Sequence, residues 1–230
     1  MNNIKNAILL IGSPKGKNSS SASLGGYLLN KIEEYDISTE TVHLHSGIRT
    51  EAKRVKFLEK IEKTDLIILA APLYVDTLPA KVIKALSLIL ENRIEENLDN
   101  VDSEKRQSFA AVVNCGFPET EQNETALRVY EQFAKEAKLN YLGGISIGMG
   151  GAVSGKSLSD MGGMTKSLIK GFDQAAEELA KNQKLSDSVI DKTSKPMMSQ
   201  KWLYTLVGNL SWRFQALRNG VYRKINDKPY

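Results

Sequence analysis

The sequence has a single cysteine, Cys115, and only two histidines, His43 and His45. One cysteine excludes a disulfide within the chain and offers no spacing typical of a metal site. The two histidines fall on one face of a predicted strand, an arrangement that can bind metal, but no third ligand accompanies them. We therefore expect no metal centre, and we interpret Cys115 as a small half-buried residue rather than a nucleophile.

Long apolar runs are also missing. No stretch approaches the roughly 20 apolar residues that a membrane-spanning helix needs. The chain begins MNNIKN, without the basic segment and small-residue cleavage site of a secretory signal. These absences lead us to expect a cytoplasmic protein. Apolar residues make up 41% and charged residues 25% of the chain, which is ordinary for a globular protein and argues against disorder.

Charge is distributed unevenly along the chain. Residues 183–230 carry nine Lys and Arg against three Asp, a net charge of +6, so residues 1–182 sum to −2 of the total of +4. The main body therefore lacks the basic footprint of a nucleic-acid-binding protein, and we expect no nucleic-acid partner.

Short apolar runs and helix-like stretches alternate through the first 182 residues. Apolar runs or alternation predict five strands, at 7–11, 39–44, 66–71, 109–113 and 141–147. Helical spacing predicts a helix after each strand, at 24–32, 55–61, 79–90, 125–138 and 168–179. Five successive βα units predict an α/β domain over 1–182, a parallel sheet with helices on both faces and right-handed crossovers.

The remainder of the chain has a different character. Residues 183–198 are polar and contain Lys195-Pro196, so we interpret them as a linker. Residues 199–230 form a predicted basic, amphipathic helical extension, which Gly208-Asn209 could divide into two helices. Its apolar stripe consists of Leu203, Leu206, Val207, Leu210, Phe214, Leu217 and Val221. We expect this stripe to dock on its own domain or on a second subunit. An anionic membrane surface is the less favoured alternative.

Ligands of open parallel sheets bind beyond the carboxyl ends of the strands. After the first strand comes Gly12-Ser13-Pro14-Lys15-Gly16-Lys17-Asn18-Ser19-Ser20-Ser21, which opens directly into a helix. Unpaired N–H groups and hydroxyls at a helix N-terminus favour a phosphate. The loop is neither a Walker loop nor a GxGxxG motif. A solvated turn with a serine N-cap is the structural alternative.

Two further loops follow buried strands. Pro72-Leu73-Tyr74-Val75-Asp76-Thr77-Leu78-Pro79 holds an aromatic residue between two prolines and could face a flat ring, or the tyrosine could pack on its own turn. Asn114-Cys115-Gly116-Phe117-Pro118 includes a glycine that would permit close backbone approach to a ligand. The glycine-rich segment 148–151 after the fifth strand is a fourth loop that could line the same ligand site.

These loops resemble those of the flavodoxin-like NAD(P)H-dependent FMN reductase family, which is related to iron–sulfur flavoproteins and quinone reductases. The matching segments are G-S-P-K followed by N-S-S-S, the strand T-D-L-I-I running into A-P-L-Y, and N-C-G-F-P. They extend over about residues 7–182, roughly three-quarters of the chain. The resemblance implies a doubly wound five-stranded sheet of order 2-1-3-4-5, bound FMN, NAD(P)H as co-substrate and a homodimer.

The resemblance also implies positions for the cofactor. The FMN phosphate would be held by Ser13, Lys15, Ser19, Ser20 and Ser21. The ribityl chain and ring would be flanked by Pro72, Leu73, Tyr74 and Val75. The polar edge of the ring would contact Asn114, Cys115, Gly116 and Phe117. Lys15 stands where the family often has arginine, which keeps the charge but loses a bidentate fork. The cysteines that bind an iron–sulfur cluster in some relatives are absent, so we expect no cluster.

Three functions follow from this interpretation. The leading hypothesis is an oxidoreductase in which FMN takes a hydride from NAD(P)H and passes electrons to a quinone, another flavin or another small acceptor, with no essential acid or base from the protein. The second is a flavodoxin-type electron carrier without nicotinamide activity. The third is a non-enzymatic module that binds another ligand or a partner on the same fold.

Overall fold

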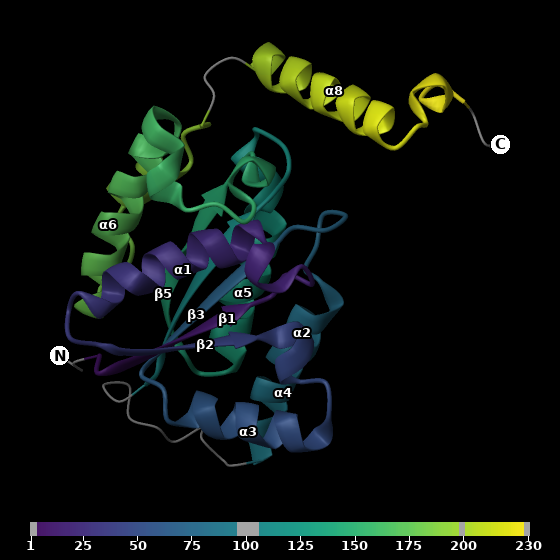
Figure 1. Ribbon diagram of the computed structural model, residues 1–230. Coiled ribbons are helices and arrows are strands. Elements are labelled where there is room, and N and C mark those ends of the chain that lie inside the picture. The colour runs from purple at the N-terminus through teal and green to yellow at the C-terminus, as the bar shows by residue number, and fades with distance from the viewer. Residues whose placement is uncertain (1–3, 96–105, 198–200, 228–230) are drawn as a thin grey trace. The chain divides into compact units, whose positions relative to one another are not determined.

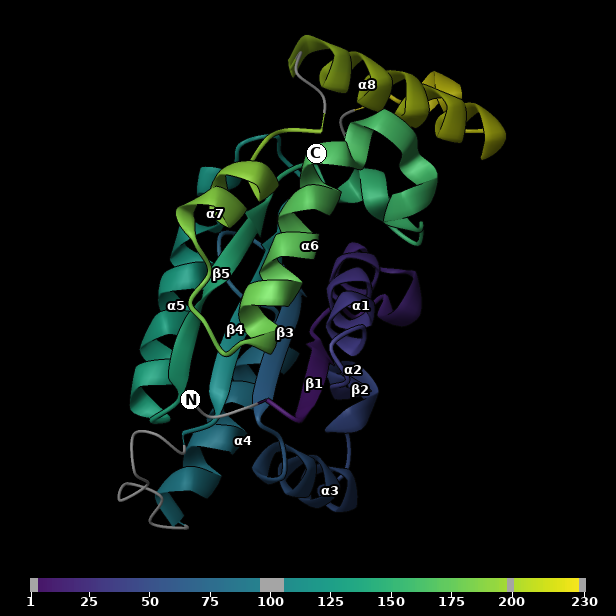
Figure 2. The ribbon, with the colours of Figure 1, turned by 90° about the vertical axis from the view of Figure 1, so that its left-hand side faces the viewer.

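The structure is a computed structural model that describes residues 4–95, 106–197 and 201–227, without the side chains of 201–204 and 207. The chain separates into two compact units, Met1–Met197 and Met198–Tyr230. Figure 1 labels most of the helices and strands of both units, and Figure 2 also labels β4 and α7.

The first unit is built on one parallel sheet. Its strands are β1 (Asn6–Ile11), β2 (Ser38–His43), β3 (Leu66–Pro72), β4 (Ser108–Asn114) and β5 (Asn140–Ile147), in the order β2-β1-β3-β4-β5. All four neighbouring pairs are parallel. The predicted sheet and its strand order are therefore confirmed. Pro72 pairs with Asn114, and Asn114 with Ile147, so the carboxyl ends of β3, β4 and β5 lie level at one edge.

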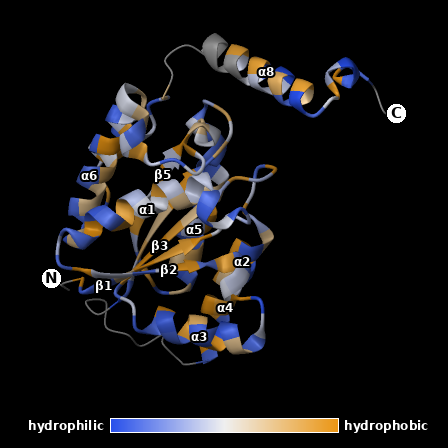
Figure 3. Cartoon of the chain, in the orientation of Figure 1, coloured by the Kyte–Doolittle hydropathy of each residue, from blue (hydrophilic) through white to orange (hydrophobic). Residues whose placement is uncertain are grey.

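Helices cover both faces of the sheet (Figure 2). One face carries α1 (Ser20–Glu33) and α6 (Lys166–Ala180), and the other carries α2 (Leu44–Gly47), α3 (Glu51–Glu62), α4 (Ala80–Glu95) and α5 (Glu124–Glu136). Because successive strand side chains point to opposite faces, Leu9 and Ile11 belong to one core and Ile8 and Leu10 to the other. Strands β3 and β4 are buried along their whole length, which explains the apolar runs Leu66–Pro72 and Phe109–Val113. Figure 3 shows the hydrophobic colouring of β3.

Short 3-10 helices occur in the connections of this unit. They are η1 (Gly16–Asn18), η4 (Thr120–Asn123), η5 (Gly150–Val153) and η6 (Leu158–Thr165). Helix α4 follows Pro79, whose carbonyl accepts hydrogen bonds from the amides of Val82 and Ile83. The proline thus stands immediately before the helix, where its missing N–H costs nothing.

The segment 183–198, expected to be a linker, contains helix α7 (Asp187–Thr193) in the structure. Val189 and Thr193 are buried, and a Cβ placed on Gly171 of α6 would lie 2.5 Å from the Thr193 Cγ2 atom. The Glu178 carboxylate accepts hydrogen bonds from the amide and hydroxyl of Ser186, at 2.8 and 2.7 Å. Residues 183–197 are therefore packed on α6 as part of the first unit.

The second unit consists of helix α8 (Lys201–Arg218) followed by η7 (Tyr222–Lys224). Helix α8 is continuous, and Gly208-Asn209 does not divide it into two helices. Gly220 has a φ of +70°, and the amides of Gly220 and Val221 donate to the carbonyls of Leu217 and Ala216. This pattern is a Schellman motif, which ends the helix. Across the described parts of both units, no helix is both long enough and apolar enough to cross a membrane.

Candidate functional site

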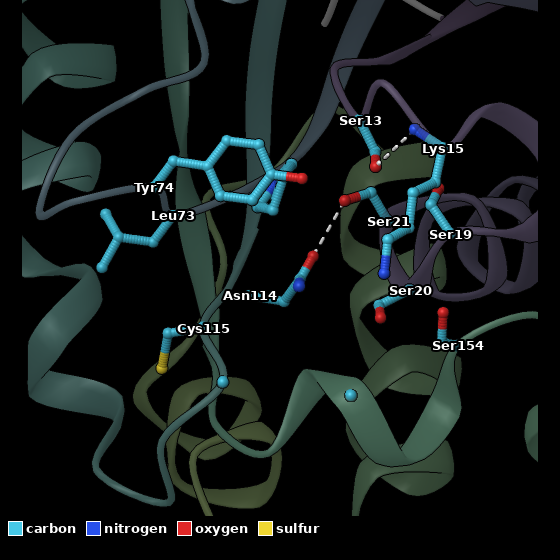
Figure 4. A pocket seen from close by; sticks show the side chains of 13 residues that line it. Ser13, Lys15, Ser19, Ser20, Ser21, Leu73, Tyr74, Asn114, Cys115 and Ser154 are labelled. Atoms are coloured by element: carbon cyan, nitrogen blue, oxygen red, sulfur yellow. Dashed lines mark hydrogen bonds between the residues drawn. The ribbon is translucent and has the colours of Figure 1, made fainter. Parts of the chain in front are cut away.

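A cleft of about 260 Å³ opens at the carboxyl ends of β1, β3 and β4, and Figure 4 shows the side chains that line it. The loops after β1 and β3 belong to the point where the strand order reverses, which is the usual ligand site of open α/β sheets. The lining residues are Ser13, Lys15, Ser19, Ser20, Ser21, Pro72, Leu73, Tyr74, Asn114, Cys115, Gly116, Gly151 and Ser154.

The loop after β1 forms the polar wall of the cleft. Ser19 is the N-cap of α1: its Oγ accepts from the Ala22 amide at 3.1 Å and donates to the Gly16 carbonyl at 2.7 Å. Ser13, Ser19 and Ser21 are buried, whereas Lys15 is exposed. The first N–H groups of a helix have no partner within it, so this wall offers donors and the positive end of a helix dipole.

A side-chain hydrogen bond joins this wall to the end of β4. The buried Ser21 hydroxyl donates to the Asn114 Oδ1 atom at 2.9 Å (Figure 4). With its oxygen held in this way, the Asn114 amide group is oriented at the floor of the cleft, beside the loop of η5: a Cβ on Gly150 would lie 2.7 Å from the Asn114 Nδ2 atom. The start of α1 and the end of β4, 93 residues apart in sequence, are thus joined by a side-chain hydrogen bond.

The loop after β3 forms the apolar wall. Tyr74 and Thr77 exchange backbone hydrogen bonds of 2.9 and 3.1 Å, and the two residues between them, Val75 and Asp76, have φ values of +48° and +58°. Positive φ at both central positions is the geometry of a type I′ turn. Tyr74 is 41% exposed and lines the cleft, while the Val75 side chain is 96% exposed at the tip of the turn.

Cys115 follows β4 at the base of the cleft and is 3% exposed. Burial raises the pKa of its thiol, although hydrogen bonds to the Phe117 backbone and the Asn123 side chain oppose this shift. The thiol donates towards the carbonyls of Phe117 and Glu119, at 3.4 and 3.5 Å. Cys115 is therefore protonated at neutral pH and has the environment of a structural residue rather than of a nucleophile.

The loop after β5 lines the cleft next to the loop after β1. Ser154 donates from its hydroxyl to the Asn18 carbonyl at 3.1 Å. The Cys115 carbonyl accepts from the Gly150 amide at 2.8 Å, which fixes η5 against the β4 loop. Gly151 belongs to the glycine-rich segment considered from sequence, whereas sequence reasoning missed Ser154. Its only signal was a hydroxyl placed shortly after that glycine run.

Eleven of the thirteen residues that the resemblance assigned to FMN line this one cleft, and two do not. Val75 points away at the tip of its turn, and Phe117 is 64% exposed. The Phe117 carbonyl instead accepts from the Met149 amide at 2.7 Å, so its backbone holds the β5 loop. Contact of either residue with a ligand remains a prediction.

The two histidines are arranged differently from the sequence interpretation. Strand β2 ends at His43, and His45 belongs to helix α2, so the two do not alternate along one strand. Within the described ranges, no group of three or more His, Cys, Asp or Glu side chains is placed to hold a metal ion.

No protein-family model and no curated protein matches the chain. Solved structures do. An NADH:FMN oxidoreductase in its apo form has a TM-score of 0.57 at 13% identity, over 86% of this chain and 98% of that one. An FMN-dependent NADH-azoreductase from Bacillus anthracis in complex with FMN has a TM-score of 0.55 at 11% identity, over 77% and 100%. A flavodoxin from Streptococcus pneumoniae TIGR4 has a TM-score of 0.51 at 14% identity, over 77% and 99%.

The chain has the flavodoxin-like fold. At these identities the comparison establishes the architecture, and the resemblance seen in the sequence is confirmed at that level. In this flavodoxin-like unit, the cleft occupies the strand-order switch point and combines a hydroxyl-rich helix N-terminus with an amide and an exposed aromatic ring. A ligand that combines a phosphate with a flat heterocycle would match these groups, because the phosphate suits the helix N-terminus and the heterocycle suits the aromatic ring.

Proposed function

We propose that the chain is an FMN-dependent oxidoreductase that takes a hydride from NAD(P)H and passes electrons to a quinone, a flavin or another small acceptor. One observation carries the proposal: three loops, each chosen from the sequence for a different part of FMN, converge on a single cleft. The names of the structural neighbours, among them an NADH:FMN oxidoreductase and an FMN-dependent NADH-azoreductase, support it.

The polar wall fits a phosphate. The N-terminus of α1 supplies backbone donors, and Ser20, partly exposed beside the buried Ser19 and Ser21, can turn its hydroxyl towards the cleft. Lys15 adds a positive charge whose side chain extends along the same wall as Ser20 and Ser21 (Figure 4). The Ser19 and Ser21 hydroxyls donate to the Gly16 carbonyl and to Asn114 Oδ1, so they fix this loop, and the backbone N–H groups at the start of α1 are in position before a ligand arrives.

The other walls fit a flat ring. A Cβ on Gly116 would meet nothing within 4 Å, so the backbone after β4 is open to close approach. Asn114 and Tyr74 line the same cleft and contribute an amide and an aromatic ring. The volume of about 260 Å³ is near the lower limit of ligand pockets, so a molecule the size of FMN would extend past its mouth.

The residues of this chain act by binding and orienting. When bound, FMN would supply the redox chemistry itself. The hydrogen bonds of Ser19 and Ser21 hold the loop after β1 that would bind the phosphate. Asn114 would orient the heterocycle, and Tyr74 would shield one side of the cleft from water. The raised pKa of the Cys115 thiol keeps this group neutral, so it adds no charge at the cleft floor.

Flavin titration tests the proposal. The purified protein is mixed with FMN, and flavin fluorescence and the visible spectrum are recorded. We expect quenching with one FMN per chain and a shifted absorption band. Colourless protein that takes up no FMN would refute the proposal and favour a non-enzymatic module on the same fold.

Comparison of FMN with riboflavin tests the phosphate site. Lys15→Gln should weaken FMN binding about fivefold, because it removes one phosphate contact at an exposed position, and should leave riboflavin affinity unchanged. Lys17→Gln is the matched control, since Lys17 is exposed on the same loop but does not line the cleft. Equal losses for both flavins would place the phosphate elsewhere.

Rapid anaerobic mixing with NADH and NADPH separates a reductase from a flavodoxin-type carrier. Direct bleaching of the bound flavin by either nicotinamide supports the reductase, whereas a carrier would stay oxidised. The family resemblance also supports a homodimer, which sedimentation of the holoprotein would test. The cytoplasmic location expected from the sequence would be tested by cell fractionation.

A further inference from the structure

The second unit carries an apolar stripe that its own residues do not cover. At 100° per residue, Leu206, Leu210, Phe214 and Leu217 fall within an arc of about 80° on helix α8. Their side chains are 45%, 56%, 68% and 63% exposed. Ala216 is the one apolar residue of this unit that is buried among those described. A helix with such a face is stable only when something covers the face.

Positive charge borders this stripe on both sides. Arg213 and Arg218 lie within about 40° of its two edges and are exposed. The far side of the helix carries Gln215, which is uncharged and exposed, and Trp212, which is 76% exposed. This placement depends on α8 being one uninterrupted helix, which the sequence left open.

The charge and apolar character continue beyond the helix. Val221, Tyr222 and Ile225 are 46%, 46% and 43% exposed, and Arg223 and Lys224 lie among them. Residues 198–230 hold six Lys and Arg against one Asp, a net charge of +5, which leaves −1 for residues 1–197. The basic character of the protein therefore comes from this unit.

We propose that the second unit binds to the surface of an anionic lipid bilayer, with the stripe Leu206, Leu210, Phe214 and Leu217 inserted at the headgroup boundary. Arg213 and Arg218 can extend their charged ends to lipid phosphates while their stems cover apolar surface. The positive charge complements an anionic surface. In a second copy, stripe against stripe would bring four arginines together, which opposes self-association through this face.

Vesicle flotation with the full chain tests this interaction. Vesicles of phosphatidylcholine with phosphatidylglycerol should carry the protein, whereas vesicles of phosphatidylcholine alone should bind it at least tenfold more weakly. Replacing both Arg213 and Arg218 with glutamine should weaken binding to the anionic vesicles about 30-fold, because each basic residue contributes about a fivefold factor near such a surface. No binding, or equal binding to both vesicle types, would overturn the proposal.

A matched pair of variants tests the inserted face. Leu210→Gln should weaken vesicle binding about tenfold, since Leu210 is central to the stripe. Trp212→Gln removes a larger and more exposed apolar side chain, 76% exposed, but Trp212 lies on the far side of the helix and its loss should change binding less than twofold. Equal losses would show that general hydrophobicity, not this face, drives binding.

Sedimentation of the same variants identifies the competing occupant. Leu210→Gln could instead convert an oligomer to a monomer, while the wild-type protein does not bind vesicles. This result would show that a second copy covers the stripe and that the bilayer proposal is wrong. None of these outcomes depends on flavin binding, so the proposal stands or falls separately from the oxidoreductase function.

Discussion

The two loops that face each other across the cleft are held in opposite ways. In the loop after β1 and the start of α1, Ser13, Ser19 and Ser21 are 3%, 2% and 1% exposed, and the Ser21 hydroxyl donates to Asn114 at the end of β4. In the loop after β3, the turn from Tyr74 to Thr77 closes on itself, with an outward-pointing valine at positive φ. The polar wall is thus anchored in the fold, whereas the apolar wall is supported mainly by its own turn.

This difference separates two consequences of mutation. Changes to Ser19 or Ser21 in the polar wall should reduce both stability and ligand binding, because their hydroxyls hold the helix start that faces the ligand. Changes in the apolar turn should leave the fold intact or improve it. The predictions below proceed from the most damaging change to the one that stabilises.

The largest effect is expected at Gly12, where the chain leaves β1. An added Cβ would lie 2.4 Å from the Val82 Cγ2 atom and 2.8 Å from the Ala71 Cβ atom, both in the buried core beside β3. Gly12→Ala should therefore lower the free energy of unfolding by about 2–3 kcal/mol, the usual cost of overpacking. Urea unfolding, followed by circular dichroism, measures the change.

Gly26 provides the control for this substitution. It lies inside α1, and a Cβ there would meet nothing within 4 Å. Gly26→Ala should raise the free energy of unfolding by about 0.5–1 kcal/mol, because alanine loses less conformational entropy in a helix. If both alanines had the same effect, close packing at Gly12 would not be what anchors the polar wall.

The link between the walls comes next. Ser21→Ala removes the 2.9 Å hydrogen bond to Asn114 Oδ1 at a site where both residues are buried. We expect a loss of about 2 kcal/mol, since the amide oxygen loses its donor away from water. Ser23→Ala, at a partly exposed position of the same helix, should be neutral or slightly stabilising. A loss at Ser21 below about 0.5 kcal/mol would show that the network is dispensable.

Sequence reasoning was most successful where local pattern and burial coincide. Strands β3 and β4 are continuous apolar runs because helices cover both their faces, so their identity was visible in the sequence. The loops of the cleft were also found, because the fold places every strand end at one edge.

Long-range contacts produced the features that sequence reasoning missed. Helix α7 buries only Val189 and Thr193, too few apolar positions for a periodic signal, and the Glu178–Ser186 hydrogen bonds that hold its start join different elements. Ser154 is held at the cleft by the hydrogen bond that its hydroxyl donates to the Asn18 carbonyl, 136 residues away in sequence. No local pattern encodes either contact.

Ser19 allows stability and ligand binding to be separated within the polar wall. Ser19→Ala removes the N-cap and should cost about 1 kcal/mol. Ser19→Asp keeps a cap acceptor but loses the donor to the Gly16 carbonyl at a buried site, so it should show a loss in urea unfolding comparable to that of Ser19→Ala. Its negative charge would in addition oppose a phosphate and weaken FMN binding more than tenfold in fluorescence titration, a loss of a size that Ser19→Ala should not show. Unchanged FMN affinity in Ser19→Asp would move the phosphate away from this helix end.

The smallest effect among the changes in the two walls, and the one gain among them, is expected at Val75. A β-branched residue at a φ of +48° is strained, and the 96% exposed side chain makes few compensating contacts within the chain. Val75→Asn should raise the free energy of unfolding by about 0.5–1 kcal/mol, since asparagine adopts this conformation readily. Val55→Asn, at an exposed position inside α3, is the control and should change stability by less than about 0.5 kcal/mol, because the two residues have similar helix propensities.

The Val75 result also decides how the apolar wall should be understood. Stabilisation by asparagine, with FMN affinity unchanged, would mean that the chain tolerates strain at the tip for a reason other than holding the cofactor, because Val75 lies outside the cleft. Contact with an electron acceptor would then be tested by comparing KM for the acceptor in both proteins. A loss of stability in Val75→Asn would instead show that the turn is not strained, and the contrast between the two walls would no longer hold.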